Sequence, residues 1–131
     1  MHINLESDYA VRIVQYLAGH DERQDAQTIA DSTHVSLRFT LKIMRKLVAA
    51  GIVKSYKGAH GGYVLARPAG KITLRQVIEA AEGPYRFSRC VDEQYACNCP
   101  TDSACRFRGI YDEITRMVTA KLDEITFDTA R

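Results

Sequence analysis

Apolar residues recur at helical spacing near the start of the chain, and end signals bound each stretch. A helix over residues 5–18 would bury one apolar face and end at Gly19, because glycine favours the position after a helix. That face carries Ala10, Ile13, Val14 and Leu17. A short helix over residues 26–32 follows, with Asp25 as its N-cap. The pattern therefore predicts a helical first third of the chain.

The next stretch predicts a further helix with a β-hairpin behind it. Ser36 can cap this helix and Gly51 ends it. Its expected apolar stripe comprises Leu37, Leu41, Met44, Leu47 and Val48. Residues 52–57 and 63–66 then read as two strands around a glycine-rich turn. Helix, turn, helix and hairpin in this order indicate a winged helix-turn-helix.

Two more helices are expected in the second half. Thr73 and Gln76 form a capping box for a helix that ends at Gly83. From about Phe107, a long helix is predicted from the apolar series Ile110, Ile114, Met117, Val118, Leu122 and Ile125. Little core remains for this helix to cover, so a partner chain would use its stripe.

The expected fold is mainly α with a small β-hairpin. It comprises a winged helix-turn-helix domain (1–83), a cysteine-rich loop (84–106) that would be irregular, and a dimerisation helix (107–131), all in one structural unit.

The second helix of the motif carries polar and cationic residues, Lys46 among them, off its expected stripe. Cations can hold phosphates and arginine can read guanine, so Arg38 is the first candidate for a base contact; Thr40 could touch a base edge or a thymine methyl. In the wing, glycines would let the backbone approach a phosphate or a narrow minor groove. An ordinary solvated face is the alternative for the helix considered alone. The candidate DNA contacts are Ser36, Arg38, Phe39, Thr40, Lys42, Arg45, Lys54, Lys57, His60 and Gly61.

Composition narrows the function class. The chain has 131 residues, a length and a mixture typical of one globular domain, and its net charge is only +2, which excludes a general polycation. No window is long and apolar enough for a membrane span and the start lacks a secretory signal, so a cytoplasmic location without a membrane partner is expected. An enzyme is not expected, because no nucleophile–base pair and no phosphate-binding glycine motif is found.

Four cysteines, Cys90, Cys97, Cys99 and Cys105, stand close together in the sequence. In a reducing compartment such a group favours metal or redox chemistry over a disulfide frame, and closely spaced thiolates hold iron–sulfur clusters. Zinc is less expected, because the spacing lacks paired Cys-x2-Cys units; a metal-free thiol switch also stays open. Adjacent thiols rarely bind one metal together without strain, which favours Cys99 as the middle ligand, with Cys97 as an alternate or a fourth.

The segments AGIVKSYKGAHGGYVLARP and KITLRQVIEAAEG, with the start LESDYAVRIVQYLA, resemble the Rrf-type bacterial transcription regulators, which include IscR-like and NsrR-like proteins. The resemblance spans nearly the whole chain. It implies a homodimeric winged-helix regulator on a pseudo-palindromic operator in double-stranded DNA, contacted by the second helix of the motif and by the wing. It also implies, for many members, an iron–sulfur cluster near the dimer helix.

The resemblance bears on the fourth cluster ligand as well. IscR-like members place a histidine three residues after the last cysteine, where this chain has Arg108. NsrR-like members use an aspartate near the N-terminus of the other subunit, and Asp8 stands in the matching place. This implies Cys90, Cys99, Cys105 and Asp8 around a [4Fe–4S] cluster, which is favoured over [2Fe–2S]. The alternative for Asp8 is a first-turn acid stabilised by the helix dipole.

The sequence thus predicts a DNA-binding transcription regulator whose operator affinity is set by a cluster that senses redox, nitric oxide or iron status. The alternatives are a cluster-free thiol-switch regulator and a member of the same family that binds and inhibits another protein.

Overall fold

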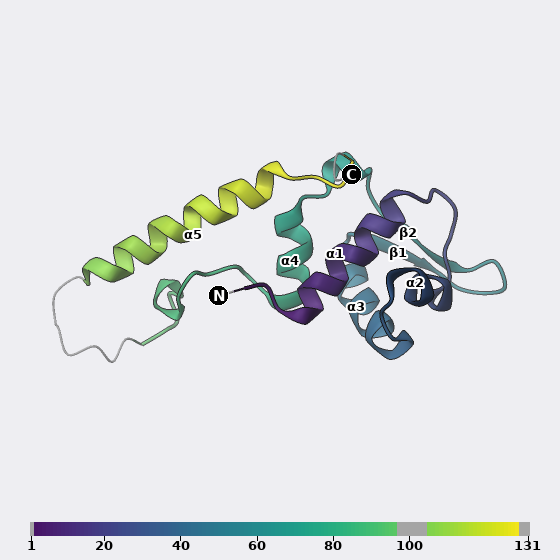
Figure 1. Ribbon diagram of the computed structural model, residues 1–131, viewed down its shortest axis with the longest axis horizontal. Coiled ribbons are helices and arrows are strands. Elements are labelled where there is room, and N and C mark those ends of the chain that lie inside the picture. Colours follow the sequence, from purple (N-terminus) through teal and green to yellow (C-terminus); the bar gives the residue numbers. More distant parts are fainter. Residues whose placement is uncertain (1, 97–104, 129–131) are drawn as a thin grey trace.

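The structure is a computed structural model that describes residues 2–96 and 105–128. Its helices are α1 (Leu5–Ala18), α2 (Ala26–Thr33), α3 (Leu37–Ala49), α4 (Leu74–Glu82) and α5 (Arg106–Glu124). The strands are β1 (Val53–Tyr56) and β2 (Gly62–Leu65), and two 3-10 turns are η1 (Ala69–Lys71) and η2 (Arg89–Val91). The expected class, mainly α with one hairpin, is confirmed. Figure 1 shows a body of α1–α4 with the hairpin, and α5 as an arm that runs away from it.

Side-chain caps define where the helices of the body begin. Asp25 accepts the N–H of Thr28 at 2.8 Å, and Ser36 Oγ accepts the N–H of Phe39 at 3.2 Å. Thr73 and Gln76 make the predicted reciprocal capping box at the start of α4. These three caps are confirmed, and each satisfies a first-turn N–H that has no partner within its helix.

The core of the body lies between α1, α3 and α4. Its large side chains with under 2% exposure are Ile13, Val14, Leu17, Ile29, Ile43, Met44, Leu47, Ile52, Ile72 and Val77. All come from α1–α4 and the segments that join them, so the body has one continuous core of its own.

The face that α3 turns to this core differs from the predicted stripe. Leu37 and Val48 are 39% and 38% exposed, whereas Thr40 and Ile43 are buried beside Met44 and Leu47. The prediction left out Ile43 and treated Thr40 as a polar surface residue, so it placed the buried stripe on a neighbouring face of the helix. A threonine can occupy a core position because its β-branched methyl group packs like that of valine.

The hairpin gains a partner from the connection between α1 and α2. β1 and β2 pair antiparallel, with Val53 opposite Leu65 and Tyr56 opposite Gly62. Gln24 then pairs with Tyr63 through two backbone hydrogen bonds of 3.1 and 2.8 Å. A Cβ on Gly62 would lie 2.8 Å from the Gln24 carbonyl oxygen, so the close approach requires glycine.

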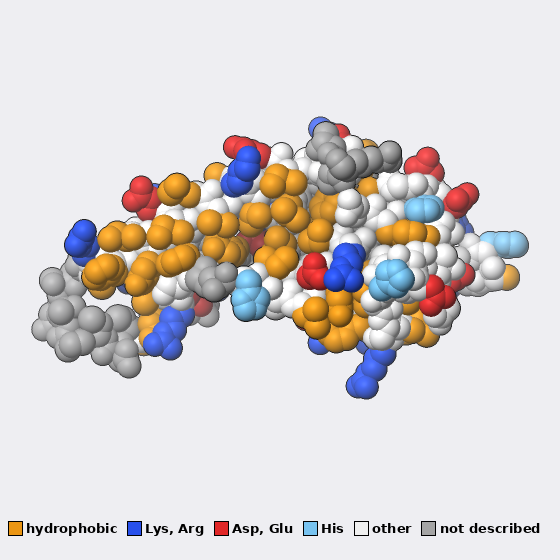
Figure 2. Space-filling model, viewed as in Figure 1, with side chains coloured by type: hydrophobic (Ala, Val, Ile, Leu, Met, Phe, Trp, Pro, Cys, Tyr) orange, Lys and Arg blue, Asp and Glu red, His pale blue; other side chains and the backbone are white. Residues whose placement is uncertain are grey.

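The buried side chains of α5 are polar, whereas those in the core of the body are apolar. The inward residues of α5 are Thr115 and Thr119, whereas Met117 is 66% exposed and Phe107 is 54% exposed. Figure 2 shows apolar side chains as a band along the side of the arm that faces the viewer. The helix was correctly expected, and its apolar stripe is half-buried within the chain, with Met117 exposed.

The segment that leads into the arm is not wholly irregular, as the sequence had suggested. It forms η2, and Phe87 anchors it on α5 by donating its N–H to Thr115 Oγ1 at 3.0 Å. The Phe87 ring also lies against that of Tyr111, with 5.4 Å between the ring centroids.

After α5 the chain returns to the body. The helix ends at Glu124, one residue short of its last expected apolar position. Leu74 then donates its N–H to the Ile125 carbonyl at 2.8 Å, and Phe127 donates to the Ala69 carbonyl at 3.2 Å. Phe127 is 6% exposed and joins the core of the body, a role that the sequence had not indicated.

Candidate nucleic-acid interface and cysteine site

A row of cations lies on the face of α3 that points away from the core. Arg38, Lys42 and Arg45 follow one another at spacings of four and three residues, and all three side chains are exposed. Ser36 is exposed at the N-terminal end of the same helix, where its hydroxyl serves as the cap. Because α3 is the second helix of the motif, this row has the chemistry to follow a phosphate backbone and to reach base edges.

Two lysines of α3 lie near Glu6 of α1 and differ in how firmly their ammonium groups are held. Lys46 Nζ lies 2.8 Å from Glu6 Oε1 and also donates to the Ala81 carbonyl at 2.9 Å, which ties α3 to α1 and α4. Lys42 Nζ is 3.9 Å from the same oxygen, and its side chain is 57% exposed. Lys46 therefore belongs to the framework, whereas Lys42 remains accessible to a ligand.

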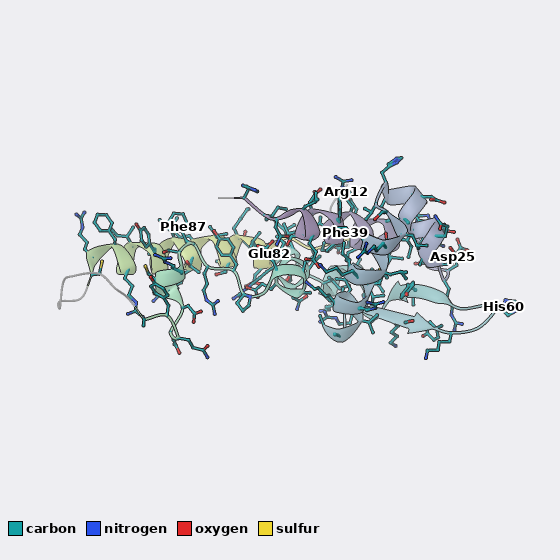
Figure 3. The ribbon with its side chains drawn as sticks, turned by 90° about the horizontal axis from the view of Figure 1, so that it is seen from below. Arg12, Asp25, Phe39, His60, Glu82 and Phe87 are labelled. Carbon is teal, nitrogen blue, oxygen red and sulfur yellow. The ribbon has the colours of Figure 1, made fainter. Side chains whose placement is uncertain are left out.

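Two further residues of α3 that were expected to contact DNA, Thr40 and Phe39, are buried or half-buried and lie off the exposed cationic row. Thr40 is fully buried, so its expected exposure is wrong and its hydroxyl is not available to a base. Phe39 is half-buried and packs edge-on against Tyr9 of α1, with 5.5 Å between the ring centroids (Figure 3). Phe39 thus positions the start of α3 on α1.

The wing carries its candidate cations on the surface. Lys54, Lys57 and His60 are exposed, and Figure 3 shows His60 at the tip of the hairpin, at the far end of the molecule from α5. Gly61 is half-buried and donates its N–H to the Gly58 carbonyl at 2.9 Å. A Cβ on Gly61 would collide with the carbonyl of Tyr56, so this glycine is required by the turn itself.

Sequence reasoning missed one cation at the wing. Arg23 lies in the connection between α1 and α2, outside the predicted helices and hairpin. Its guanidinium carbon lies 3.6 Å from the centroid of the Tyr56 ring, and its Nη1 donates to the His60 carbonyl at 3.2 Å. No local sequence pattern announces this contact, because 37 positions separate the two hydrogen-bonded residues.

Two of the four cysteines lie within the described residues, and both flank the start of the arm. Cys90 is in η2, which packs on α5, and Cys105 is the N-cap residue of α5. Both are free thiols and half-buried. Cys97 and Cys99 lie outside the described residues. Among residues 2–96 and 105–128, no three side chains of His, Cys, Asp or Glu come together as a metal site.

Asp8 lies in the first half of α1 and already has a partner. Its Oδ2 lies 2.8 Å from Nη2 of Arg12, one helical turn later, and the two side chains are 44% and 45% exposed. Arg12 also donates to the Thr33 carbonyl at 3.4 Å and lies over the Tyr9 ring. Asp8 is thus held at the surface of α1 by a partner one helical turn away.

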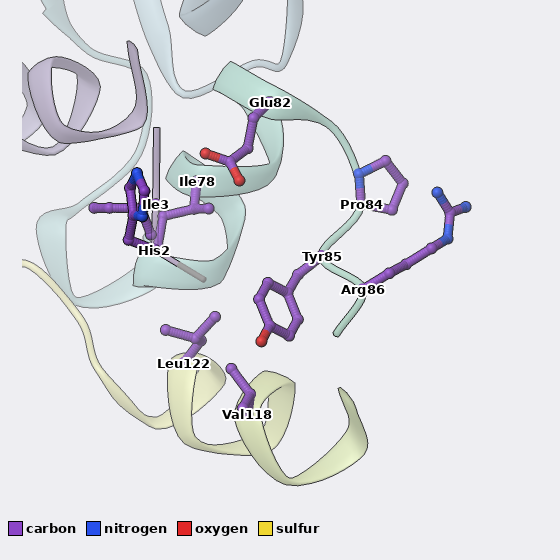
Figure 4. A pocket seen from close by; sticks show the side chains of 9 residues that line it. All are labelled: His2, Ile3, Ile78, Glu82, Pro84, Tyr85, Arg86, Val118 and Leu122. Atoms are coloured by element: carbon purple, nitrogen blue, oxygen red, sulfur yellow. The ribbon is translucent and has the colours of Figure 1, made fainter. Parts of the chain in front are cut away.

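A pocket of about 380 Å³ opens between the start of the chain, the end of α4 and α5 (Figure 4). Ile3, Val118 and Leu122 supply much of its apolar wall. Its one carboxylate, Glu82, accepts hydrogen bonds from the Asn4 N–H and the Ser7 hydroxyl. The pocket thus continues the apolar face of α5, and His2 and the already hydrogen-bonded Glu82 belong to its polar lining.

The part of the chain that the structure describes has no helix with the length and hydropathy of a membrane span.

Comparisons with known proteins agree with this architecture. The family model of Rrf2, an iron-dependent transcriptional regulator, matches residues 3–130. Protein rrf2 of Nitratidesulfovibrio vulgaris is 33% identical over 128 residues, covering 96% of this chain and 84% of that protein. The transcriptional regulator NsrR of Shouchella clausii is 24% identical over 128 residues, covering 96% of this chain and 85% of that protein.

A solved structure gives the same result. CymR, the global cysteine regulator of Bacillus subtilis, superposes with a TM-score of 0.76 at 28% identity, covering 98% of this chain and 94% of that one. Members of the family bind DNA, typically as dimers, and they are regulators rather than enzymes. Relatives of the IscR and NsrR kind bind iron–sulfur clusters, whereas CymR-like members lack them. This chain belongs to the Rrf2 family and is a DNA-binding transcriptional regulator.

Proposed function

We propose that the chain forms a homodimer whose affinity for a two-fold operator is set by an iron–sulfur cluster. The observation that carries this proposal is the position of the cysteine segment between the two parts of the molecule. Cys90 lies in a turn that packs on α5, and Cys105 directly precedes that helix. A change at these thiols would therefore act at the N-terminal end of α5, the end of the arm that lies away from the body (Figure 1).

The donors fit such a cluster by their chemistry. Cys90, Cys99 and Cys105 would supply thiolates, and Asp8 of the partner subunit or Cys97 would complete the set. When bound, the cluster supplies a redox-active centre whose potential depends on its ligands and on its exposure to solvent. Asp8 would bind through one carboxylate oxygen, and its pair with Arg12 through Oδ2 can orient that carboxylate, since carboxylates that ligate metals are commonly hydrogen-bonded themselves.

The apolar face of α5 is the proposed dimer contact. Ile110, Ile114, Val118 and Leu122 are only half-buried within the chain, and Met117 stands out beside them. The pocket beside Ile3 lengthens this apolar surface toward the body. Two copies joined here would present two α3 helices to DNA, with half-sites about one helical turn, roughly 34–36 Å, apart or a multiple of it.

Metal content tests the sensor. Protein purified without oxygen should be brown and contain about four irons per chain, and Cys105→Ala should lose both the iron and the visible absorbance. Asp8→Ala should lower iron content, whereas Asp31→Ala, which removes an exposed carboxylate of α2, should leave it unchanged. Full iron in Cys105→Ala would contradict the ligand set, and about two irons would indicate a [2Fe–2S] cluster instead.

DNA titration tests the interface. Arg38→Ala should weaken binding to a selected duplex by about tenfold or more and relax preference at one base pair, as expected for a base contact. Lys57→Ala should weaken binding to all sequences alike and lower the salt slope by about one. Lys71→Ala, which removes an exposed cation on η1, is the control. Unchanged binding by both Arg38→Ala and Lys57→Ala would contradict the proposed surface.

A cluster-free thiol switch is the second candidate. It is favoured by the two free, half-buried thiols and by the likeness to CymR. A colourless protein whose DNA affinity changes reversibly with peroxide and a thiol reductant would support it. A protein that protects no DNA in a footprint would instead favour the role of binding and inhibiting another protein.

A further inference from the structure

The wing is held from outside the hairpin by the connection between α1 and α2. Gln24 pairs with Tyr63 through two backbone hydrogen bonds, and its side-chain oxygen accepts the hydroxyl of Tyr16 at 2.8 Å. The connection is thus attached to α1 on one side and to β2 on the other. It forms a one-residue β-bridge at the edge of the wing.

Arg23 extends this attachment to the tip. Its guanidinium stacks on Tyr56 at the end of β1, 3.6 Å from the ring centroid, and reaches the carbonyl of His60 at 3.2 Å. One side chain therefore contacts both the last residue of a strand and the turn beyond it. A planar guanidinium suits this double role, because one face packs on the ring while the edge donates the hydrogen bond.

The tip has little else to hold it. Residues 57–60 are exposed, and the Gly61–Gly58 hydrogen bond is internal to the turn. Gly58 has a φ of +97°, which glycine adopts readily but which leaves the turn many alternative conformations. The orientation of the tip relative to the body therefore depends on contacts such as that of Arg23.

Arg23 is poorly placed to attract a phosphate itself. Asp21, Glu22 and Asp25 flank it along the chain, so the field around the connection is not that of a cationic patch. The cations of the hairpin, Lys54 and Lys57, lack such acidic neighbours in sequence.

We infer that Arg23 is a positioning residue of the DNA-binding wing. It fixes the tip against β1 before DNA arrives, so that Lys57 and His60 meet the DNA without a further loss of conformational freedom. This inference rests on the proposed function of the wing as a DNA contact.

Footprinting and salt titration of the full chain test it. The probe is a duplex of about 30 base pairs selected from random sequence by the wild-type protein. Arg23→Ala should bind about three- to tenfold more weakly, lose hydroxyl-radical protection only where the wing lies, and keep the wild-type salt slope. Lys57→Ala should lower that slope by about one, and Lys71→Ala serves as the control for simple loss of a positive charge.

A double-mutant cycle defines the contact. Tyr56→Leu should reproduce the loss seen with Arg23→Ala, and the double variant should be no worse than either, because both changes break one interaction. Arg23→Lys should restore little, since an ammonium lacks the planar stacking face.

Several outcomes would overturn the inference. The first is wild-type affinity and a wild-type footprint for Arg23→Ala. The second is a salt slope lowered by about one, which would make Arg23 a phosphate contact. The third is a uniform loss of protection together with a lower melting temperature. A wild-type protein that protects no DNA would remove the proposed function as well; wild-type protection that Arg23→Ala leaves intact would remove only the positioning role.

Discussion

The body and the arm of this regulator bury opposite kinds of side chain. In the body, α1, α3 and α4 enclose Ile, Leu, Val and Met with almost no exposure. In the arm, α5 turns Thr115 and Thr119 inward and leaves Met117 and Phe107 outside. The core of the body is thus closed to solvent, whereas part of the apolar surface of the arm stays exposed.

The two parts meet where the chain returns after α5. Phe127 is the one side chain after this helix that the structure shows fully within the core of the body. The arm is thus fastened to the body just after its C-terminal end by Phe127, and the Phe87 segment contacts α5 farther along, at Thr115. This arrangement separates what folds the body from what the arm offers to a partner.

The largest expected effect distinguishes the two phenylalanines. Phe127→Ala should lower the free energy of unfolding by about 3 kcal/mol or more, because it leaves a cavity in a closed core. Phe107→Ala should change it by only about 0.5 kcal/mol, since the ring is more than half exposed. Denaturant titrations at low protein concentration would measure both, and equal losses would break the distinction between body and arm.

The next largest effect is expected from a charged residue on the exposed apolar side of α5. Met117→Asp should raise the dissociation constant of the homodimer by at least about tenfold, because it places an unpaired carboxylate against an apolar surface. Sedimentation equilibrium would follow it, with Arg116→Ala as the control on another side of the helix. A dimer unaffected by Met117→Asp would show that copies associate through a different face.

Two buried threonines sharpen the comparison further. Thr115 Oγ1 accepts from the Phe87 N–H and donates to the Tyr111 carbonyl, so Thr115→Val should destabilise the protein by about 1–3 kcal/mol. Thr40 Oγ1 is buried without a hydrogen-bond partner among the described residues, so Thr40→Val should stabilise it by about 1 kcal/mol. Thermal unfolding would compare the two, and Thr40→Val should also keep wild-type DNA affinity.

The smallest effect concerns pH in the body. The Thr28 N–H holds the pKa of Asp25 below its ordinary value, so the stabilisation is complete above the ordinary pKa and is lost as pH falls through the lowered one. The stability difference between wild type and Asp25→Ala should be constant near neutral pH and shrink below about pH 4. Asp31→Ala is the matched control, and a difference that grows in acid would contradict the cap.

What the sequence predicted well was local. Asp25, Ser36 and Thr73 announce helix starts through contacts three residues away, and the order of elements follows from them. Thr40 was misplaced because hydrophobicity alone does not distinguish two adjacent faces of a short helix. Phe127 and Arg23 act through partners far along the chain, which no periodic pattern encodes.

The residues of the candidate site also divide into those that a local sequence pattern places and those whose partners the pattern does not show. The cationic row of α3 follows from helix geometry once Ser36 is known as its cap, so Arg38, Lys42 and Arg45 could be placed on one exposed face. The ion pair of Asp8 with Arg12 is also local, at a spacing of four residues, yet the sequence pattern did not show which partner Asp8 would take.

The β-bridge at Gln24 also bears on solubility. A two-stranded hairpin has two open edges, and each is a template on which another extended chain can pair and aggregate. Gln24 occupies the edge of β2 at Tyr63, and β1 is only four residues long and carries Lys54. The wing can therefore project far into solvent while offering little backbone to unwanted strand exchange between copies.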